Sequence, residues 1–447
     1  SSFLFSGLIL TSSDFFFSFS EKINLLEEQN RILLKEQNNH FVKLNSLKEK
    51  LAEIENKLNR WDAEKADSTG IVSHYGRWRN QSGNAFAYLY FTGYVSWSPS
   101  EYFNFQVGKG KNFWGDGYRS LFLSDYAGSY PFLKATGNIW NIKYISLFSA
   151  LQDVNGFSGS FDLHEKYTAS HYLSWNVCPR LNINLFETVV WRGGDSTGHR
   201  GFDVHYLNPV IFYRPVEFSL GSPDNVIMGG GFRWHIFKSF HIYGQLVLDE
   251  FKLAEIKADV KHLLSPSDTG VQSGWWANKY GVQAGFKWFD PAGIENLLFQ
   301  AEYNDVRPFT YSHGNSLENY GNLYQPLAHP LGANFREVVA RFAYLRQRWI
   351  FRAKIILARY GLNTDSINYG GDIYRSYDYR RREYGNFTCQ GRIQDLVTSE
   401  IKAAYLINPS WNLQFEAGAA ARWLQNEQGE NTDVFFFMGF RTRIYNR

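Results

Sequence analysis

From residue 85 to the end of the chain, apolar and polar residues alternate with a period of two over long runs. In 86–97, small, aliphatic and aromatic residues fill one face of the predicted strand, while tyrosine, threonine and serine fill the other. The run 411–423 shows the same alternation, with a tryptophan at each end of its apolar face. Such runs are about twice as long as the strands of soluble sheets, and they match the strands of membrane-spanning barrels.

The connections between these runs alternate between short and long. Short turns are predicted at 98–100, 140–141, 178–180, 237–239, 290–293, 347–348 and 408–409. Long polar connections are predicted at 110–131, 153–164, 193–225, 254–273, 306–334, 361–385 and 425–432. Bacterial outer-membrane barrels have tight periplasmic turns and longer extracellular loops, so the long connections are expected outside the cell.

About 15 strands are expected between 86–97 and 434–445. Because bacterial single-chain barrels have an even number of strands, at least one more is expected ahead of residue 85. The segment 71–78 is one source for it, and a barrel that has lost part of its natural N-terminal region is the other explanation.

The N-terminal part follows a different pattern. Residues 1–20 form an apolar, serine-rich, leader-like segment. Residues 21–61 carry apolar residues in heptads without Pro or Gly, which predicts a coiled-coil helix about 60 Å long. This helix either oligomerises or binds an envelope partner, or it folds back on the barrel. Residues 62–84 are polar and are expected to form a linker to the barrel domain, 85–447.

Composition supports a membrane barrel. Aromatic residues make up 18% of the chain, including 28 Tyr and 14 Trp, and their apolar rings with polar tips suit a membrane interface. A net charge of +3 gives no electrostatic support for nucleic-acid binding. No run of about 20 apolar residues is present, so strands are expected to cross the membrane. The predicted fold is an all-β antiparallel transmembrane barrel of about 16 or more strands, integral to the bacterial outer membrane.

Catalytic and metal-binding signatures are absent from the sequence. Cys178 and Cys389 lie in different predicted strand regions, and they are either free thiols or one bridge. No Ser–His–Asp order and no paired-carboxylate signature stands out. We therefore expect a non-enzymatic protein without a metal or cofactor.

The stretch 107–132 combines glycines, charges and aromatic rings. Its glycan-binding candidates are Lys109, Lys111, Asn112, Trp114, Asp116 and Arg119. Aromatic faces stack on sugar C–H groups, and the polar side chains bind hydroxyls. The alternative is structural: Asp116 and Arg119 pair with each other and hold the loop inside the barrel. The two roles are compatible, and the charge on the predicted inner wall favours a loop folded inward.

Two further groups are candidates for ligand contact. His313, His329 and Arg336 flank the connection 306–334, where ordered loop packing is the alternative. Arg380, Arg381 and Arg382 lie among tyrosines and suit an acidic polysaccharide or a lipopolysaccharide phosphate, unless they form a solvated face. Inward strand positions carry charges of both signs, which predicts salt-bridged networks on the inner wall.

Several stretches together resemble a known family. They are GKGKNFWGDGYRSLFLSD (108–125), YPFLKATGNIWNIKY (130–144), YLNPVIFYRPVEFSLGSPDN (206–225), YGQLVLDEFKL (243–253), GWWANKYGVQAGFKWFD (274–290), EYNDVRPFTYSH (302–313) and QPLAHPLGANFRE (325–337). Over about 80–447 the chain resembles the Wzi-type capsule-assembly family of Bacteroidetes, especially its RemB-like gliding-motility branch. The resemblance implies an outer-membrane β-barrel with helical material at its periplasmic end, surface attachment of polysaccharide, and a role in gliding.

The expected function is that of a non-enzymatic outer-membrane barrel whose extracellular loops anchor surface polysaccharide or serve gliding and adhesion. One alternative is a porin-like channel for small solutes. Another is an envelope scaffold that recruits its partner through 21–61.

Overall fold

The computed structural model describes residues 71–72, 76–82, 85–88, 90–154, 163–195, 198–208, 224–264 and 272–442. Contacts divide the chain into Ser1–Ala63 and Glu64–Arg447, and every described residue belongs to the second unit. The leader-like segment 1–20 and the coiled coil predicted over 21–61 lie outside the described residues.

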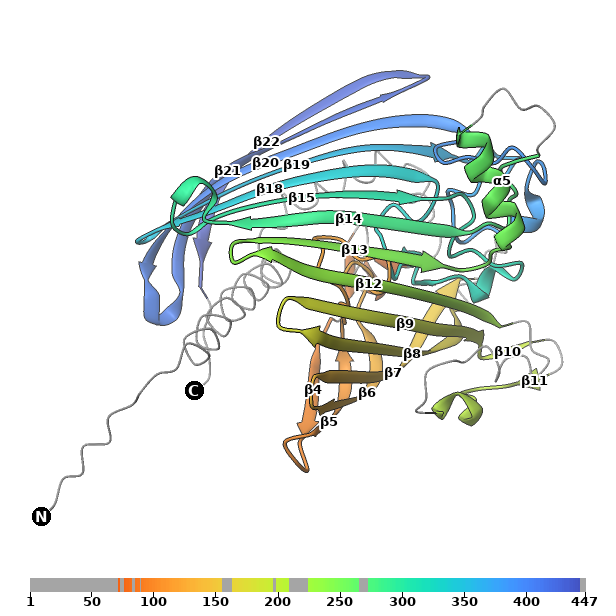
Figure 1. The fold of residues 1–447 in the computed structure, drawn as a ribbon, viewed down its shortest axis with the longest axis horizontal. Coiled ribbons are helices and arrows are strands. Elements are labelled where there is room, and N and C mark those ends of the chain that lie inside the picture. Colours follow the sequence, from red (N-terminus) through yellow and green to blue (C-terminus); the bar gives the residue numbers. More distant parts are fainter. Residues whose placement is uncertain are drawn as a thin grey trace, which may run out of the picture. The chain divides into compact units, whose positions relative to one another are not determined.

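A single sheet of 15 strands dominates the described unit, and this number matches the strands expected from 86–97 onward. The additional strand expected for a barrel of about 16 or more does not join this sheet among the described residues, where the first and last strands of the sheet are not paired with each other. Each strand pairs antiparallel with the previous strand of the sheet, in the order of the sequence, as Figure 1 shows. The strands are β4 (Gly93–Trp97), β5 (Phe103–Gly110), β6 (Tyr130–Ile139), β7 (Ile142–Val154), β8 (Leu163–Cys178), β9 (Leu181–Arg192), β12 (Asn225–Phe237), β13 (Phe240–Leu248), β14 (Tyr280–Phe289), β15 (Leu297–Val306), β18 (Phe335–Arg346), β19 (Trp349–Leu362), β20 (Arg392–Asn408), β21 (Leu413–Asn426) and β22 (Gly429–Arg441). This order is an up-and-down meander, in which neighbouring strands are joined by hairpins.

The region ahead of β4 departs from the prediction. β1 (Ile71–Val72), β2 (Gly76–Ser82) and β3 (Ala85–Tyr88) form a separate three-stranded sheet. The strand expected at 86–97 is therefore two strands in two sheets, and the expected linker 62–84 contains β1 and β2. Short strands that pair locally satisfy their backbone groups without joining the large sheet.

The alternation of connections is confirmed with one exception. All seven predicted short turns join consecutive strands of the sheet at one end. Six predicted long connections lie at the other end, but 425–432 is wrong: β21 and β22 form a hairpin joined by residues 427 and 428. Smaller elements occupy the long connections: β10 (Gly194–Asp195), β11 (Gly198–His199), η2 (Val204–Leu207), α5 (Leu253–Leu264), η4 (Ser316–Glu318), β16 (Gly321–Asn322), β17 (Gln325–Pro326) and η5 (Tyr377–Tyr379). Of the described helices, none has the length and apolar character needed to cross a membrane.

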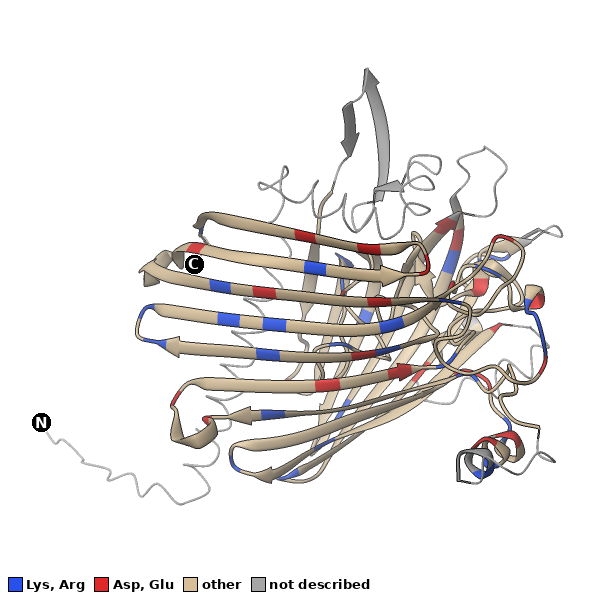
Figure 2. Ribbon diagram, turned by 90° about the horizontal axis from the view of Figure 1, so that it is seen from above, with Lys and Arg blue, Asp and Glu red and all other residues tan. Residues whose placement is uncertain are grey.

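The two faces of the sheet differ in chemistry. On β18, Val338 and Phe342 are exposed, whereas Glu337 and Val339 are buried. On β22, Val434, Phe436, Met438 and Phe440 are all exposed, and they alternate with half-buried residues. An apolar outer face on long strands is the pattern of a barrel wall in contact with lipid. Charged residues lie in the middle of several strands, as Figure 2 shows, and they belong to the opposite face.

The connection 111–129, called the inward loop below, fills part of the concave side. It leaves β5 and returns at β6, yet it bonds to β15, which is seven strands beyond β6 in the sheet. In a flat sheet this distance is about 34 Å at 4.8 Å per strand. The sheet therefore curves around the inward loop, and the side chains between them form the core.

Candidate functional site: the inward loop and the wall that holds it

The tip of the inward loop is bound by a buried carboxylate. Glu302 on β15 accepts the backbone N–H groups of Tyr118 at 2.7 Å and of Arg119 at 3.1 Å. It also accepts the Tyr243 hydroxyl at 2.9 Å and the Asn304 amide at 3.0 Å. Four donors compensate for the burial of this charge, and two of them fix the loop backbone.

The tip has no room for a side chain at Gly117. A Cβ on Gly117 would lie 2.5 Å from a Glu302 carboxylate oxygen and 2.6 Å from the Arg119 carbonyl oxygen. Gly115 has a φ of +138°, which side chains other than glycine rarely adopt. These glycines therefore allow the backbone to approach the wall closely.

The two charged residues of the loop pair with the wall and not with each other. Asp116 accepts from Arg233 of β12 at 2.8 Å. Arg119 donates to Glu337 of β18 at 3.1 Å, and only 1% of the Glu337 side chain is exposed. The predicted Asp116–Arg119 pair is therefore wrong, although both residues hold the loop inside as expected. Burial disfavours the charged guanidinium, but Glu337, Tyr118 and Glu302 together outweigh burial, so the pKa of Arg119 is raised.

Tyr118 at the tip contacts strands β18 and β19. Its ring lies under Arg341 at 4.7 Å, and its hydroxyl accepts from Lys354 at 3.5 Å. Burial opposes ionisation of the phenol, but Lys354, Arg119 and Arg341 together outweigh burial, so the pKa of Tyr118 is lowered. The tip thus touches a wall that is rich in cations.

Mixed charges line the inner wall beyond the tip, as predicted. Glu400 pairs with Lys354 at 3.1 Å and with Lys402 at 3.6 Å, and Arg441 approaches Glu416 at 3.8 Å. The side chains of Lys354 and Glu400 are 29% and 33% exposed. These partly exposed charges mark a solvent-accessible interior beside the loop.

His329 belongs to the connection between β15 and β18 and joins the same network. Its Nε2 lies 2.7 Å from Glu337, and the ring stacks on Phe335 at 4.2 Å. Burial lowers the pKa of His329, although Glu337 acts in the opposite direction. His313 lies elsewhere, 2.8 Å from Glu318.

The remaining candidates of 107–132 each contact other residues of the protein. Lys109 lies 4.8 Å from the ring of Phe91, and Lys111 donates to the carbonyl of Asp125. Asn112 is buried and accepts from Lys134 at 3.2 Å. Trp114 is buried and stacks on Tyr172 with ring centroids 5.4 Å apart. A sugar reaches Asn112 or Trp114 only if the inward loop moves.

A second cluster lies among the long connections. The rings of Trp276 and Tyr377 are tilted by 45° with their centroids 4.7 Å apart, and Arg380 lies over the Trp276 ring at 4.2 Å. Lys252 lies over Trp275 at 4.4 Å. Both tryptophans are half-buried. We call Trp275, Trp276, Tyr377 and Arg380 the aromatic platform.

Sequence reasoning had singled out Arg380 but missed both tryptophans, although GWWANKY had marked the stretch. Arg381 and Arg382 are exposed beside the platform. Arg336 is separate from both sites, because it lies on the outer face of β18 and pairs with Asp305 at 2.8 Å.

Both cysteines are free thiols: Cys178 is exposed and Cys389 is buried. Burial raises the pKa of Cys389 to about 11. Among the residues that the structure describes, no group of three His, Cys, Asp or Glu side chains is placed to hold a metal ion.

The long antiparallel strands, apolar outer face and charged inner face define an integral outer-membrane β-barrel protein. Neither a protein-family model nor a curated protein matches the chain. Among solved structures, OpdQ of Pseudomonas aeruginosa aligns at 8% identity and a TM-score of 0.41, covering 78% of this chain and 80% of that one. The outer membrane protein OprD of Pseudomonas aeruginosa aligns at 10% identity and a TM-score of 0.37, covering 76% and 75%. OccAB2 of Acinetobacter baumannii aligns at 9% identity and a TM-score of 0.36, covering 76% and 75%. At these scores the similarity carries no functional information.

Proposed function

We propose that this chain is a non-enzymatic outer-membrane channel, narrowed by the inward loop, for small anionic solutes. The observation that carries the proposal is the position of Tyr118 and Arg119, whose backbone is bound to Glu302 beside the charged wall. A loop anchored inside a barrel sets the width of the remaining passage. The channel was the second choice from sequence, and the anchored tip beside partly exposed charges moves it ahead.

The charge of the wall sets the expected ion preference. Below Glu337, the inward positions of the described strands β18 to β22 carry six basic side chains: Arg341, Arg352, Lys354, Lys402, Arg422 and Arg441. The acidic side chains at such positions are three: Glu400, Glu416 and Asp433. A low-dielectric wall with an excess of cations concentrates anions inside it.

Single-channel recording in planar bilayers tests this proposal. We expect small, anion-selective steps, and we expect Lys354→Gln to reduce the selectivity because Lys354 lies at the tip. Arg346→Gln is the matched control, since Arg346 lies on the same β18–β19 hairpin at its periplasmic end. Protein that inserts into the bilayer but gives no steps would refute the channel.

Attachment of surface polysaccharide is the second candidate. The aromatic platform favours it, because partly exposed rings beside arginines provide both a stacking face and charge for an acidic sugar. The family resemblance over 80–447 supports this candidate and adds gliding and adhesion as outputs. Glycan-array binding by the Trp276→Ala and Arg380→Gln variants tests this candidate. Glycan binding that survives both changes would exclude the aromatic platform as the binding site. A scaffold role through 21–61 remains a separate prediction, tested by the oligomer mass after deletion of that segment.

A further inference from the structure

Two arginines lie directly opposite each other on the outer face of the sheet. Arg336 of β18 and Arg359 of β19 are paired in register, and their side chains are 55% and 58% exposed. Like charges directly opposite on neighbouring strands destabilise the pair. An arrangement of this kind is stabilised by an anion that both guanidinium groups contact.

Each arginine has one aspartate on its far side. Asp305 of β15 accepts from Arg336 at 2.8 Å, and Asp395 of β20 accepts from Arg359 through two bonds of 2.6 and 2.9 Å. Across four neighbouring strands, the order in register is Asp305, Arg336, Arg359 and Asp395. The aspartates at the two ends of this row fix the arginine side chains, and the two arginines lie next to each other at its centre.

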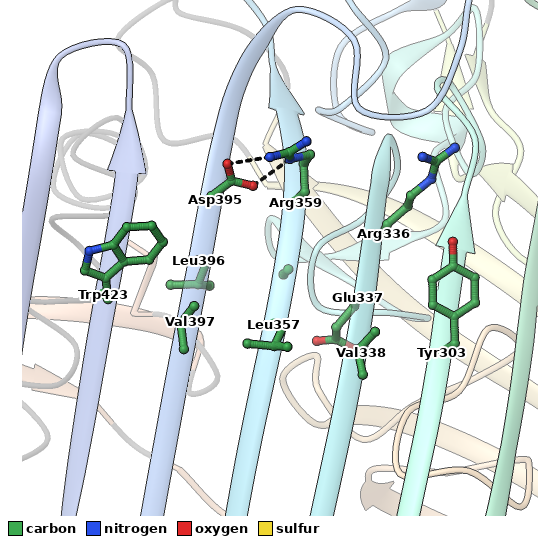
Figure 3. A pocket seen from close by; sticks show the side chains of 11 residues that line it. Tyr303, Arg336, Glu337, Val338, Leu357, Arg359, Asp395, Leu396, Val397 and Trp423 are labelled. Carbon is green, nitrogen blue, oxygen red and sulfur yellow. Dashed lines mark hydrogen bonds and ion pairs between the residues drawn. The ribbon is translucent and has the colours of Figure 1, made fainter.

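An apolar row lies immediately beneath the charged one. The five residues of this row come from five neighbouring strands and are paired in register: Tyr303, Val338, Leu357, Val397 and Trp423. Together with Arg336, Arg359 and Asp395 they line a shallow groove of about 320 Å³, shown in Figure 3. Tyrosine and tryptophan at its two sides are the residues that favour a membrane–water interface.

The position of the groove defines the chemistry of its occupant. The charged row lies at the strand ends that carry the long connections, and the apolar row lies toward the middle of the outer face. Below Val338 the outer face of β18 continues as Ala340, Phe342 and Tyr344. A ligand with phosphate at the interface and acyl chains along the wall satisfies both rows, whereas a soluble sugar leaves the apolar row exposed to lipid.

We propose that this groove binds a phosphorylated glycolipid of the outer leaflet, the lipid A part of lipopolysaccharide. One phosphate sits between Arg336 and Arg359, where planar guanidinium groups bind it with paired hydrogen bonds. The acyl chains lie against Val338 and Leu357. The site is on the outer wall, so it does not depend on the interior channel.

The experiment uses the full chain in detergent micelles and titrates it with bisphosphorylated lipid A, with binding followed by native mass spectrometry. We expect Arg336→Gln with Arg359→Gln to weaken binding by about tenfold or more, because both phosphate donors are lost. Arg336→Lys with Arg359→Lys should give an intermediate affinity, since charge is kept and the paired bonds are lost. The control, Arg346→Gln with Arg348→Gln, removes two charges from the other end of the same hairpin and should bind as wild type does.

Two further probes separate the lipid from a simple anion. Lipid A without phosphates should bind the wild type much more weakly than the bisphosphorylated form. Inorganic phosphate in large excess should displace little of the bound lipid, because it makes no apolar contact. The inference is overturned if the double Gln variant keeps its affinity, if removal of the phosphates has no effect, or if inorganic phosphate displaces the lipid fully. The affinity retained by the Lys variant distinguishes loss of the site from loss of the fold.

Discussion

Replacement of Glu302 by alanine tests how the inward loop is held. The change removes the acceptor of the Tyr118 and Arg119 backbone N–H groups, which lie 2.7 and 3.1 Å from it. A hydrogen bond to a charged acceptor contributes roughly 1.5–3 kcal/mol, so the two bonds together contribute about 3–6 kcal/mol. Water that enters the space left by the side chain replaces part of this hydrogen-bond energy. We therefore expect the free energy of opening the tip to fall by about 3 kcal/mol.

Hydrogen exchange at the Tyr118 and Arg119 amides measures that loss. A drop of about 3 kcal/mol in the free energy of opening speeds amide exchange by about 150-fold, because these amides exchange only when the tip is open. In the bilayer, the same variant should show larger and noisier conductance steps. Glu416→Ala is the control, because it removes a carboxylate from the same inner wall, near Arg441 and away from the tip. Unchanged exchange at both tip amides in Glu302→Ala would refute the anchoring argument.

Other consequences are open to direct measurement. Gly117→Ala should displace the tip as Glu302→Ala does, because its Cβ would lie 2.5 Å from Glu302; faster exchange at Tyr118 checks it. Lys166→Ala should lower stability by about 3–5 kcal/mol, measured by urea unfolding in micelles, because Lys166 is fully buried 2.9 Å from Asp153. Burial lowers the pKa of His329, so the unfolded chain takes up a proton first as pH falls below about 6.5. The wild type should therefore lose thermal stability between pH 7.5 and 5.5, and His329→Asn should lose less. Alkylation of the folded protein at pH 8 should modify Cys178 alone, because Cys389 is buried and its thiol pKa is about 11.

The sheet was predictable from sequence because both of its signals are local. Period-two alternation identifies a strand whose two faces meet different surroundings, and turn residues mark the ends of each strand. The short turn at 347–348 followed directly from the sequence. The hairpin at 427–428 was missed because its flanks are polar, so the ends of β21 and β22 resemble a loop.

Pairing between distant segments was not predictable in the same way. Asp116 and Arg119 are close in sequence, but the curvature of the sheet brings Arg233 and Glu337 to them instead. Arg336 was expected to flank the connection 306–334, and its place on the outer wall depends on strand parity at the exact start of β18. Trp276 contacts Tyr377 and Arg380 across about a hundred residues of chain, and no local pattern encodes that contact.

The anchoring of the inward loop also constrains the order in which the protein is assembled. Tyr118 and Arg119 bond to residues 183 to 236 positions later in the chain. Closing so long a segment costs about 3 kcal/mol more in chain entropy than closing a turn of four residues. Hairpins such as β5–β6 therefore form early, while the loop between them waits for β15 and β18. The inward loop therefore takes its place late in folding, once β15 and β18 have joined the sheet.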